Sequence, residues 1–246
     1  MPLYAYVLAA LAGAGAGVVV RRWLERGSWR LPEEPPPRWS SSGEAPGSRW
    51  SSSGEALAEP RIETTRTHLL PRRPWEPVAL AFVWPALLAA ADRTDHPWAW
   101  PALAVLSAAG AALTSIDLAV HRLPDVFTLG SVPVVGALLA LASWREGDWQ
   151  GWATAACAAG VTLLVLLVLG LGGMGLGDVK LGVLLAGTLG WFGVTVALVG
   201  LLLGFVLGGL WAGALLLSRR ASRTTRFAYG PWMLLGALVA LLTMPA

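Results

Sequence analysis

The chain of 246 residues is strongly apolar, because 55% of its residues are hydrophobic and only 13% are charged. A soluble globular domain is about a quarter charged. Together with a mean hydropathy of +0.60, this balance excludes an ordinary soluble domain and indicates a protein that folds in a bilayer. The formal net charge of +3 is spread through loops between apolar segments, so we expect membrane lipid, and not nucleic acid, as the partner of the basic residues.

Eight apolar segments are predicted to cross the membrane. A spanning backbone must satisfy its own hydrogen bonds, so each segment should be a helix crossing a hydrocarbon layer of about 30 Å. In chain order, the predicted spans are residues 2–20, 77–91, 97–116, 126–143, 151–171, 179–196, 197–217 and 229–245. The sixth and seventh follow each other without a polar break, which leaves open whether they form one re-entrant unit. The predicted fold is an all-α, polytopic integral membrane protein.

The distribution of basic residues predicts the orientation of these spans. If the segment after the first span is cytoplasmic, every Lys and Arg except Arg93 and Arg145 lies on the cytoplasmic side. Positive charge is retained on that side of a membrane. One span more or fewer would place the arginines of residues 219–226 on the wrong side, so we expect about eight spans and both termini outside.

The first segment is predicted to be retained as an N-terminal transmembrane anchor, residues 1–20. No Lys or Arg precedes it and basic residues follow it at once, which is the reverse of a cleavable signal peptide. The polar segment 21–76 that comes next repeats the octamer RWSSSGEA at residues 38–45 and 49–56. Such a composition cannot bury a core, so we predict a disordered cytoplasmic loop and treat its glutamates as solvated charges. Residues 77–246 then form the membrane-embedded domain.

Two glycine ladders lie within the predicted spans. Gly13 and Gly17 are four residues apart, as are Gly200, Gly204 and Gly208. Such spacing lets helices approach closely, and we interpret both ladders as packing surfaces. Whether they also join two copies of the chain in a homo-oligomer is left open.

Three carboxylates remain at the predicted cytoplasmic edge once the acids of the outer loops and of the 21–76 loop are set aside. Asp117 and Asp125 lie in SIDLAVHRLPDVFTL, and Asp178 ends the glycine-rich turn GGMGLGD. Ionisable groups beside hydrocarbon are costly, so each is a candidate functional residue. Asp117 and Asp178 follow and precede predicted spans at similar depth, and tertiary packing could bring them together.

A pair of carboxylates suits one kind of chemistry in particular. Two carboxylates about 3 Å apart share a proton, so one can act as a base on water and the other as an acid toward a scissile carbonyl, as in aspartic proteases. On position alone, however, a solvated loop charge or an N-cap role for Asp178 explains the acids more simply.

The neighbours of Asp178 fit a site at this edge. Gly172, Gly173, Gly175 and Gly177 would let the backbone bend and lie close to a substrate strand, whereas no flanking strand supports a phosphate-binding loop. Lys180 is the only lysine, and it could hold a carboxylate ionised, orient a backbone carbonyl or reach lipid headgroups.

No metal site is predicted. Cys157 is the only cysteine, which excludes an intramolecular disulfide and a multi-cysteine site. His121 beside Arg122 has no second His or Cys near it in sequence, so we interpret both as loop polarity with substrate contact left open.

Two motifs resemble those of the type IV prepilin peptidases. The segment DLAVHRLPD at residues 117–125, followed by VFTL, resembles the family's first motif, and GMGLGDVKL at residues 173–181 resembles its second, GxGDxKL. Weaker matches are AYGP at residues 228–231, which resembles a Phe-Gly-Pro element with Tyr in place of Phe, and the end of the first span. The order of the two motifs on one membrane face makes the resemblance specific.

The resemblance implies roles for individual residues. Asp117 and Asp178 would be the catalytic pair. The residues with supporting or substrate-binding roles would be Pro124, Asp125, Gly175, Gly177 and Lys180.

The same resemblance implies the reaction and its place. The chain would be a membrane aspartic endopeptidase of the bacterial cytoplasmic membrane that removes the short basic leader of a prepilin or pseudopilin, as in type IV pilus or type II secretion systems. Many members also carry paired CxxC motifs that bind zinc, associated with methylation from S-adenosylmethionine. This chain lacks them, so the zinc site cannot form. Proteolysis needs no cofactor, and methyltransferase activity with S-adenosylmethionine is left open.

Two other classes compete with this interpretation. A transporter or channel could use Asp117 and Asp178 to bind a proton or cation, but it would need acids near mid-bilayer and an inverted repeat, and the sequence indicates neither. A scaffold of a pilus or secretion complex would make both acids dispensable.

Overall fold

The computed structural model describes residues 1–27, 74–120, 123–170, 175–218 and 228–244, and these residues form a helical bundle. The helices are α1 (Leu3–Arg26), α2 (Glu76–Arg93), α3 (Trp100–Val120), α4 (Asp125–Glu146), α5 (Gly151–Gly170), α6 (Leu176–Phe192), α7 (Val194–Leu217) and α8 (Gly230–Thr243), with a 3-10 turn, η2 (Pro97–Ala99), before α3. Each predicted span coincides with one of these eight helices, so the all-α prediction is confirmed. Residues 28–73 of the predicted loop, with both octamer repeats, lie outside the described residues, whereas residues 21–26 and Glu76, at its two ends, are helical and not loop.

Several helix boundaries differ from the prediction: α3 continues to Val120, four residues beyond its predicted end, and α6 begins at Leu176, three residues before its predicted start, so both aspartates lie within helices. Helix α1 continues to Arg26, six residues beyond the predicted end of the first span. Helices α6 and α7 are separate, because Gly193 adopts a φ of 141° that interrupts the helix, so the break falls three residues before the predicted boundary. A positive φ is a conformation that glycine adopts readily, and an apolar run gives no polar signal for it.

The described helices fit a membrane. Five are long and apolar enough to cross one: Leu3–Arg26, Pro97–Ala119, Asp125–Glu146, Gly151–Gly170 and Val194–Leu217. Helices α6 and α8, of 17 and 14 residues, are about 25 and 21 Å long, shorter than a hydrocarbon layer of about 30 Å. The chain is therefore a polytopic membrane protein, while a full count of eight spans stays a prediction.

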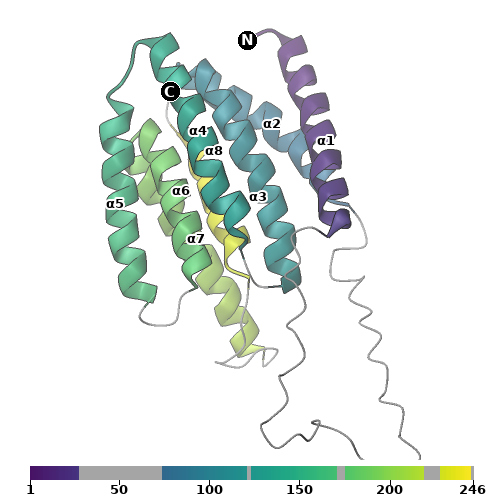
Figure 1. Ribbon diagram of the computed structural model, residues 1–246, viewed down its shortest axis with the longest axis vertical. Coiled ribbons are helices and arrows are strands. Elements are labelled where there is room, and N and C mark those ends of the chain that lie inside the picture. The colour runs from purple at the N-terminus through teal and green to yellow at the C-terminus, as the bar shows by residue number, and fades with distance from the viewer. Residues whose placement is uncertain (28–73, 121–122, 171–174, 219–227, 245–246) are drawn as a thin grey trace, which may run out of the picture.

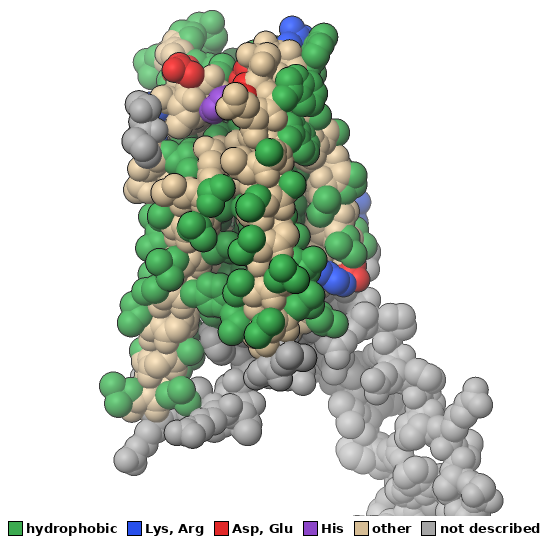
Figure 2. Space-filling view, turned by 90° about the vertical axis from the view of Figure 1, so that its left-hand side faces the viewer, with side chains coloured by type: hydrophobic (Ala, Val, Ile, Leu, Met, Phe, Trp, Pro, Cys, Tyr) green, Lys and Arg blue, Asp and Glu red, His purple; other side chains and the backbone are tan. Residues whose placement is uncertain are grey.

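The outside of the bundle is apolar. Leu164 on α5, Leu202 on α7 and Leu8 on α1 are at least 60% exposed. Figure 2 shows one such face, where hydrophobic side chains cover the middle of the helices and charged side chains gather toward the ends. A monomeric soluble protein rarely exposes so large an apolar surface, whereas lipid tails cover it readily.

Both termini lie at one end of the bundle, and the C-terminal end of α3 and the N-terminal ends of α6 and α8 lie at the other (Figure 1). Helices α3 and α6 are the most buried: Leu113 and Ile116 of α3 and Leu181 and Leu185 of α6 are at most 1% exposed. The two predicted acids, Asp117 and Asp178, are thus carried by the central helices.

The glycine ladders pack helices in pairs, as predicted. A Cβ built on Gly13 would collide with the Leu80 backbone of α2, and one on Gly17 with that of Pro77. On α7, a Cβ on Gly204 would lie 2.9 Å from the Met233 Cα of α8. The missing side chains therefore bring α1 against α2 and α7 against α8, whose contacts are among the most extensive in the bundle.

Candidate active site

Asp117 lies near the end of α3 with its side chain turned toward the start of α8. It is buried, with 4% of its surface exposed, and its Oδ2 accepts a hydrogen bond of 3.0 Å from the backbone N–H of Gly230. Gly230 is the first residue of α8, which has no side-chain cap of its own. The first N–H groups of a helix lack partners within it and carry partial positive charge, so this contact favours the ionised Asp117 carboxylate.

A side chain at position 230 would crowd Asp117. A Cβ there would lie 3.0 Å from the Asp117 Oδ2 and 3.4 Å from the Leu123 Cδ2. The sequence analysis placed Gly230 in a weak family match and gave it no role, because a backbone donor leaves no side-chain pattern. A glycine before a proline at the start of an apolar span is the signal that could have found it.

Asp178 occupies the first turn of α6 and is half-buried. The N-cap of α6 is Gly175, so the interpretation of Asp178 as the N-cap is wrong. The Asp178 N–H instead donates to the Gly175 carbonyl at 3.0 Å.

The two acids interact although they are 61 residues apart in sequence. Asp178 lies just before the span predicted to start at residue 179, which places it at the edge of the membrane. Burial, followed by the nearby negative charge of Asp117, raises the pKa of the Asp178 carboxyl to about 6. Because Asp117 is stabilised in its ionised form by the Gly230 N–H and Asp178 resists ionisation, the pair favours one negative charge and one proton.

Lys180 contacts Asp125 across two helices. Its Nζ donates to the Asp125 Oδ1 at 2.6 Å, which joins α6 to the first residue of α4. Of the alternatives for Lys180, the structure thus has it holding a carboxylate. Asp125 is exposed, and Pro124 is the N-cap of α4, so these two residues define the start of that helix beside the acidic pair.

Leu123 fills the space between three helix ends. A Cβ on Gly177 would lie 3.0 Å from the Leu123 Cβ, so the glycine is needed for α6 to approach the α3–α4 connection. Gly175 is exposed, with its Cβ position 3.4 Å from the Asp178 Oδ2. Four other residues considered for this edge, His121, Arg122, Gly172 and Gly173, lie outside the described residues.

A buried glutamate close to Asp117 was missed by the sequence analysis, which counted it among loop charges. Glu76, at the start of α2, is fully buried, and its Oε1 accepts a 2.6 Å hydrogen bond from the Ser115 hydroxyl of α3. Arg21 of α1 lies 3.7 Å from the same oxygen. The position of Glu76 directly before a proline and an apolar run is typical of a first helical turn. The cluster joins α1 and α2 to α3 two residues before Asp117.

Across the described ranges, no three His, Cys, Asp or Glu side chains are placed to hold a metal ion. The site is thus two carboxylates, from α3 and α6, completed by a backbone donor of α8. Such a pair can take a proton from water and give one to a carbonyl oxygen.

Comparison with known proteins gives one match. Residues 104–213 match the model of the type IV leader peptidase family, a segment that contains Asp117, Asp125, Asp178 and Lys180 but ends before α8. No curated protein and no solved structure matches the chain.

Proposed function

Because the segment that carries both aspartates matches the type IV leader peptidase family, we propose that the chain is a membrane aspartic endopeptidase that removes the basic leader of a prepilin or pseudopilin. The observation that carries the proposal is the electrostatic coupling of the buried Asp117 with Asp178 at one end of the bundle. The family match alone implies peptidase activity on prepilins, and the assignment of roles below is our own.

The two aspartates have different roles in the proposed reaction. Asp117, ionised and held by the Gly230 N–H, takes a proton from a water molecule as that water attacks the scissile carbonyl. Asp178 gives its proton to the carbonyl oxygen, which forms a neutral tetrahedral intermediate. When the intermediate collapses, Asp178 recovers a proton from a hydroxyl and the proton on Asp117 passes to the leaving nitrogen. The pair returns to one charge and one proton, with no covalent intermediate.

Cleavage takes place at the cytoplasmic face of the bacterial cytoplasmic membrane. The acids lie at the end of the bundle opposite both termini (Figure 1), and the distribution of arginines puts that end inside. The termini are then outside, and the leader of a substrate reaches the acids from the cytoplasm while its apolar helix stays in the membrane.

The position of the acids argues against a transporter. Asp117 is four residues from the end of α3, and Asp178 is the third residue of α6, so both lie at a bundle end. Coupled transporters hold their ions near the membrane midplane, where helices are interrupted. In the described residues the interruption at Gly193 lies at the far end of α6 from Asp178.

The proposal is tested by incubating the purified chain in lipid vesicles with a synthetic prepilin that has a basic leader, a glycine and an apolar helix. We expect two products cut after the glycine, identified by mass spectrometry, and no further mass from a methyl group when S-adenosylmethionine is added. An intact prepilin together with acid-dependent proton flux into the vesicles would instead identify a transporter.

Lys180→Met is expected to leave most of the cleavage activity. The Lys180 and Asp125 side chains are 34% and 61% exposed, and an exposed ion pair contributes less than about 1 kcal/mol to stability. The cleavage rate of Lys180→Met should stay within about tenfold of the wild-type rate. Asp125→Asn removes the same ion pair, so it should have the same effect. A Lys180→Met variant that retains its melting temperature but loses all cleavage would show that this lysine acts on the reaction itself.

A further inference from the structure

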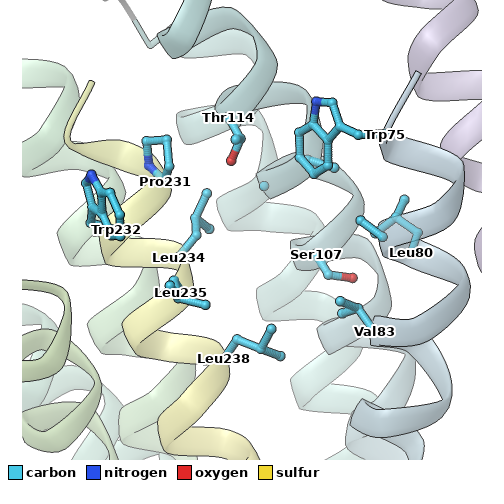
Figure 3. Close-up of a pocket in the computed structure, with 13 residues that line it drawn as sticks. Trp75, Leu80, Val83, Ser107, Thr114, Pro231, Trp232, Leu234, Leu235 and Leu238 are labelled. Atoms are coloured by element: carbon cyan, nitrogen blue, oxygen red, sulfur yellow. The ribbon is translucent and has the colours of Figure 1, made fainter. Parts of the chain in front are cut away.

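A groove lies between α2, α3 and α8, next to the acidic pair. It has a volume of about 430 Å³, within the range of about 300–1,000 Å³ typical of binding sites. Small residues of α3, among them Gly110 and Ala111, form its floor, and larger side chains of α2 and α8, such as Leu80 and Leu238, form its walls. Figure 3 shows these side chains converging from the two outer helices over α3.

The groove offers almost nothing polar to an occupant. Its lining includes two hydroxyls, those of Ser107 and Thr114. The Ser107 Oγ already donates to the Ala104 carbonyl at 2.9 Å and accepts from the Trp84 Nε1 at 3.1 Å. A polar occupant would lose its hydrogen bonds to water without replacement, so the groove suits an apolar one.

One end of the groove lies beside Asp117. Thr114 precedes Asp117 by three residues on α3, which is one helical turn along nearly the same face. Pro231 lines the groove directly after Gly230, whose N–H is bonded to Asp117. In Figure 3, Thr114 and Pro231 lie at one end of the groove and Leu238 at the other. The groove therefore runs from the site of cleavage into the membrane.

We propose that this groove binds the first two turns of the apolar helix that follows the cut in the substrate. The inference rests on the proposed peptidase function. From Ser107 to Thr114 the floor extends about 10 Å, the length of two helical turns. The cut end of the substrate helix lies by Thr114 and Pro231, and its later residues lie by Leu238.

This register follows from the polarity of the substrate. The basic leader precedes the cut and stays on the cytoplasmic side, while the apolar helix can leave the acids only toward the membrane interior. Binding an apolar helix in a groove requires side-chain complementarity but few hydrogen bonds. The acids fix where the chain is cut, and the groove fixes which residue of the chain arrives there.

The test compares two substrates and two variants. Ala79 of α2 is half-buried and lines the groove, whereas its neighbour Val78 is 60% exposed on the outside. We expect Ala79→Trp to raise the KM for a full prepilin about tenfold by filling the groove. A short peptide that ends about one helical turn after the cut should be cleaved as by wild type. Val78→Trp should leave the cleavage of both substrates as in wild type.

Equal effects of Ala79→Trp on both substrates, or none on either, would overturn the groove assignment and leave the peptidase function intact. If wild type cleaves neither substrate, the proposed function itself fails.

Photo-cross-linking tests the occupant of the groove directly if Ala79→Trp does not fold or the short peptide is not cut. With p-benzoylphenylalanine at position 235, which lines the groove, light should join the enzyme to the first two turns of the prepilin helix. Cross-links to lipid alone would make the groove a lipid site and refute the proposal.

Discussion

Asp117→Asn and Asp178→Asn are each expected to reduce leader cleavage by about a thousandfold or more, because the proposed general acid–base catalysis is lost with either carboxyl. An asparagine side chain neither takes a proton from water nor gives one to a carbonyl oxygen. Folding should survive, since an amide oxygen at position 117 still accepts the Gly230 N–H that now bonds to Asp117. Cleavage of a co-expressed prepilin, followed by gel shift at equal membrane levels, measures the effect.

The matched control for these variants is Asp148→Asn. Asp148 is a half-buried acid in the turn between α4 and α5, where its carboxylate accepts the Gln150 N–H at 2.9 Å. The Asp148→Asn variant should cleave the prepilin at the wild-type rate. Wild-type cleavage by either dyad variant would remove the proposed mechanism, and a scaffold function would then explain the chain better.

Gly236→Leu should abolish the folded bundle or lower its melting temperature steeply. A Cβ at position 236 would lie 2.5 Å from the Gly200 carbonyl oxygen and 2.8 Å from the Gly204 Cα. Both are backbone atoms of α7 and cannot turn aside, so α8 must move away. Overpacking of this kind costs about 3 kcal/mol. Melting of the detergent-solubilised protein, monitored by fluorescence-detected gel filtration, measures it.

Gly209→Leu on α7 provides the comparison. Position 209 is exposed, and a Cβ there would meet no atom within 4 Å, so the variant should melt with wild type. Because α8 carries the Gly230 N–H into the active site, surviving Gly236→Leu protein should also have lost activity. Equal melting of the two glycine variants would show that α7 and α8 do not depend on this contact.

Much of the fold follows from the sequence because a bilayer imposes one simple rule. Apolar segments of suitable length must be helices, and each of the eight predicted segments is one. The Gly193 break was misplaced because it lies inside an uninterrupted apolar run, where hydropathy does not change.

The candidate site was only partly predictable. Asp117 and Asp178 stood out because carboxylates beside hydrocarbon are rare, and the structure makes them neighbours. The Gly230 N–H did not stand out, since every residue but proline has such a donor and only the packing of α8 against α3 aims this one. Glu76 was misassigned for the opposite reason: its charge indicated a loop, and only its bond to Ser115 shows that it is buried.

The cluster of Glu76, Ser115 and Arg21 holds α1 and α2 in place independently of the segment that joins them. It fastens the C-terminal part of α1 and the first turn of α2 to the same point on α3, so both helices are held in place by contacts of their own. The segment between them then only has to connect two positions that are already fixed. Its length should have little effect on stability, because the entropic cost of closing a loop grows slowly with loop length.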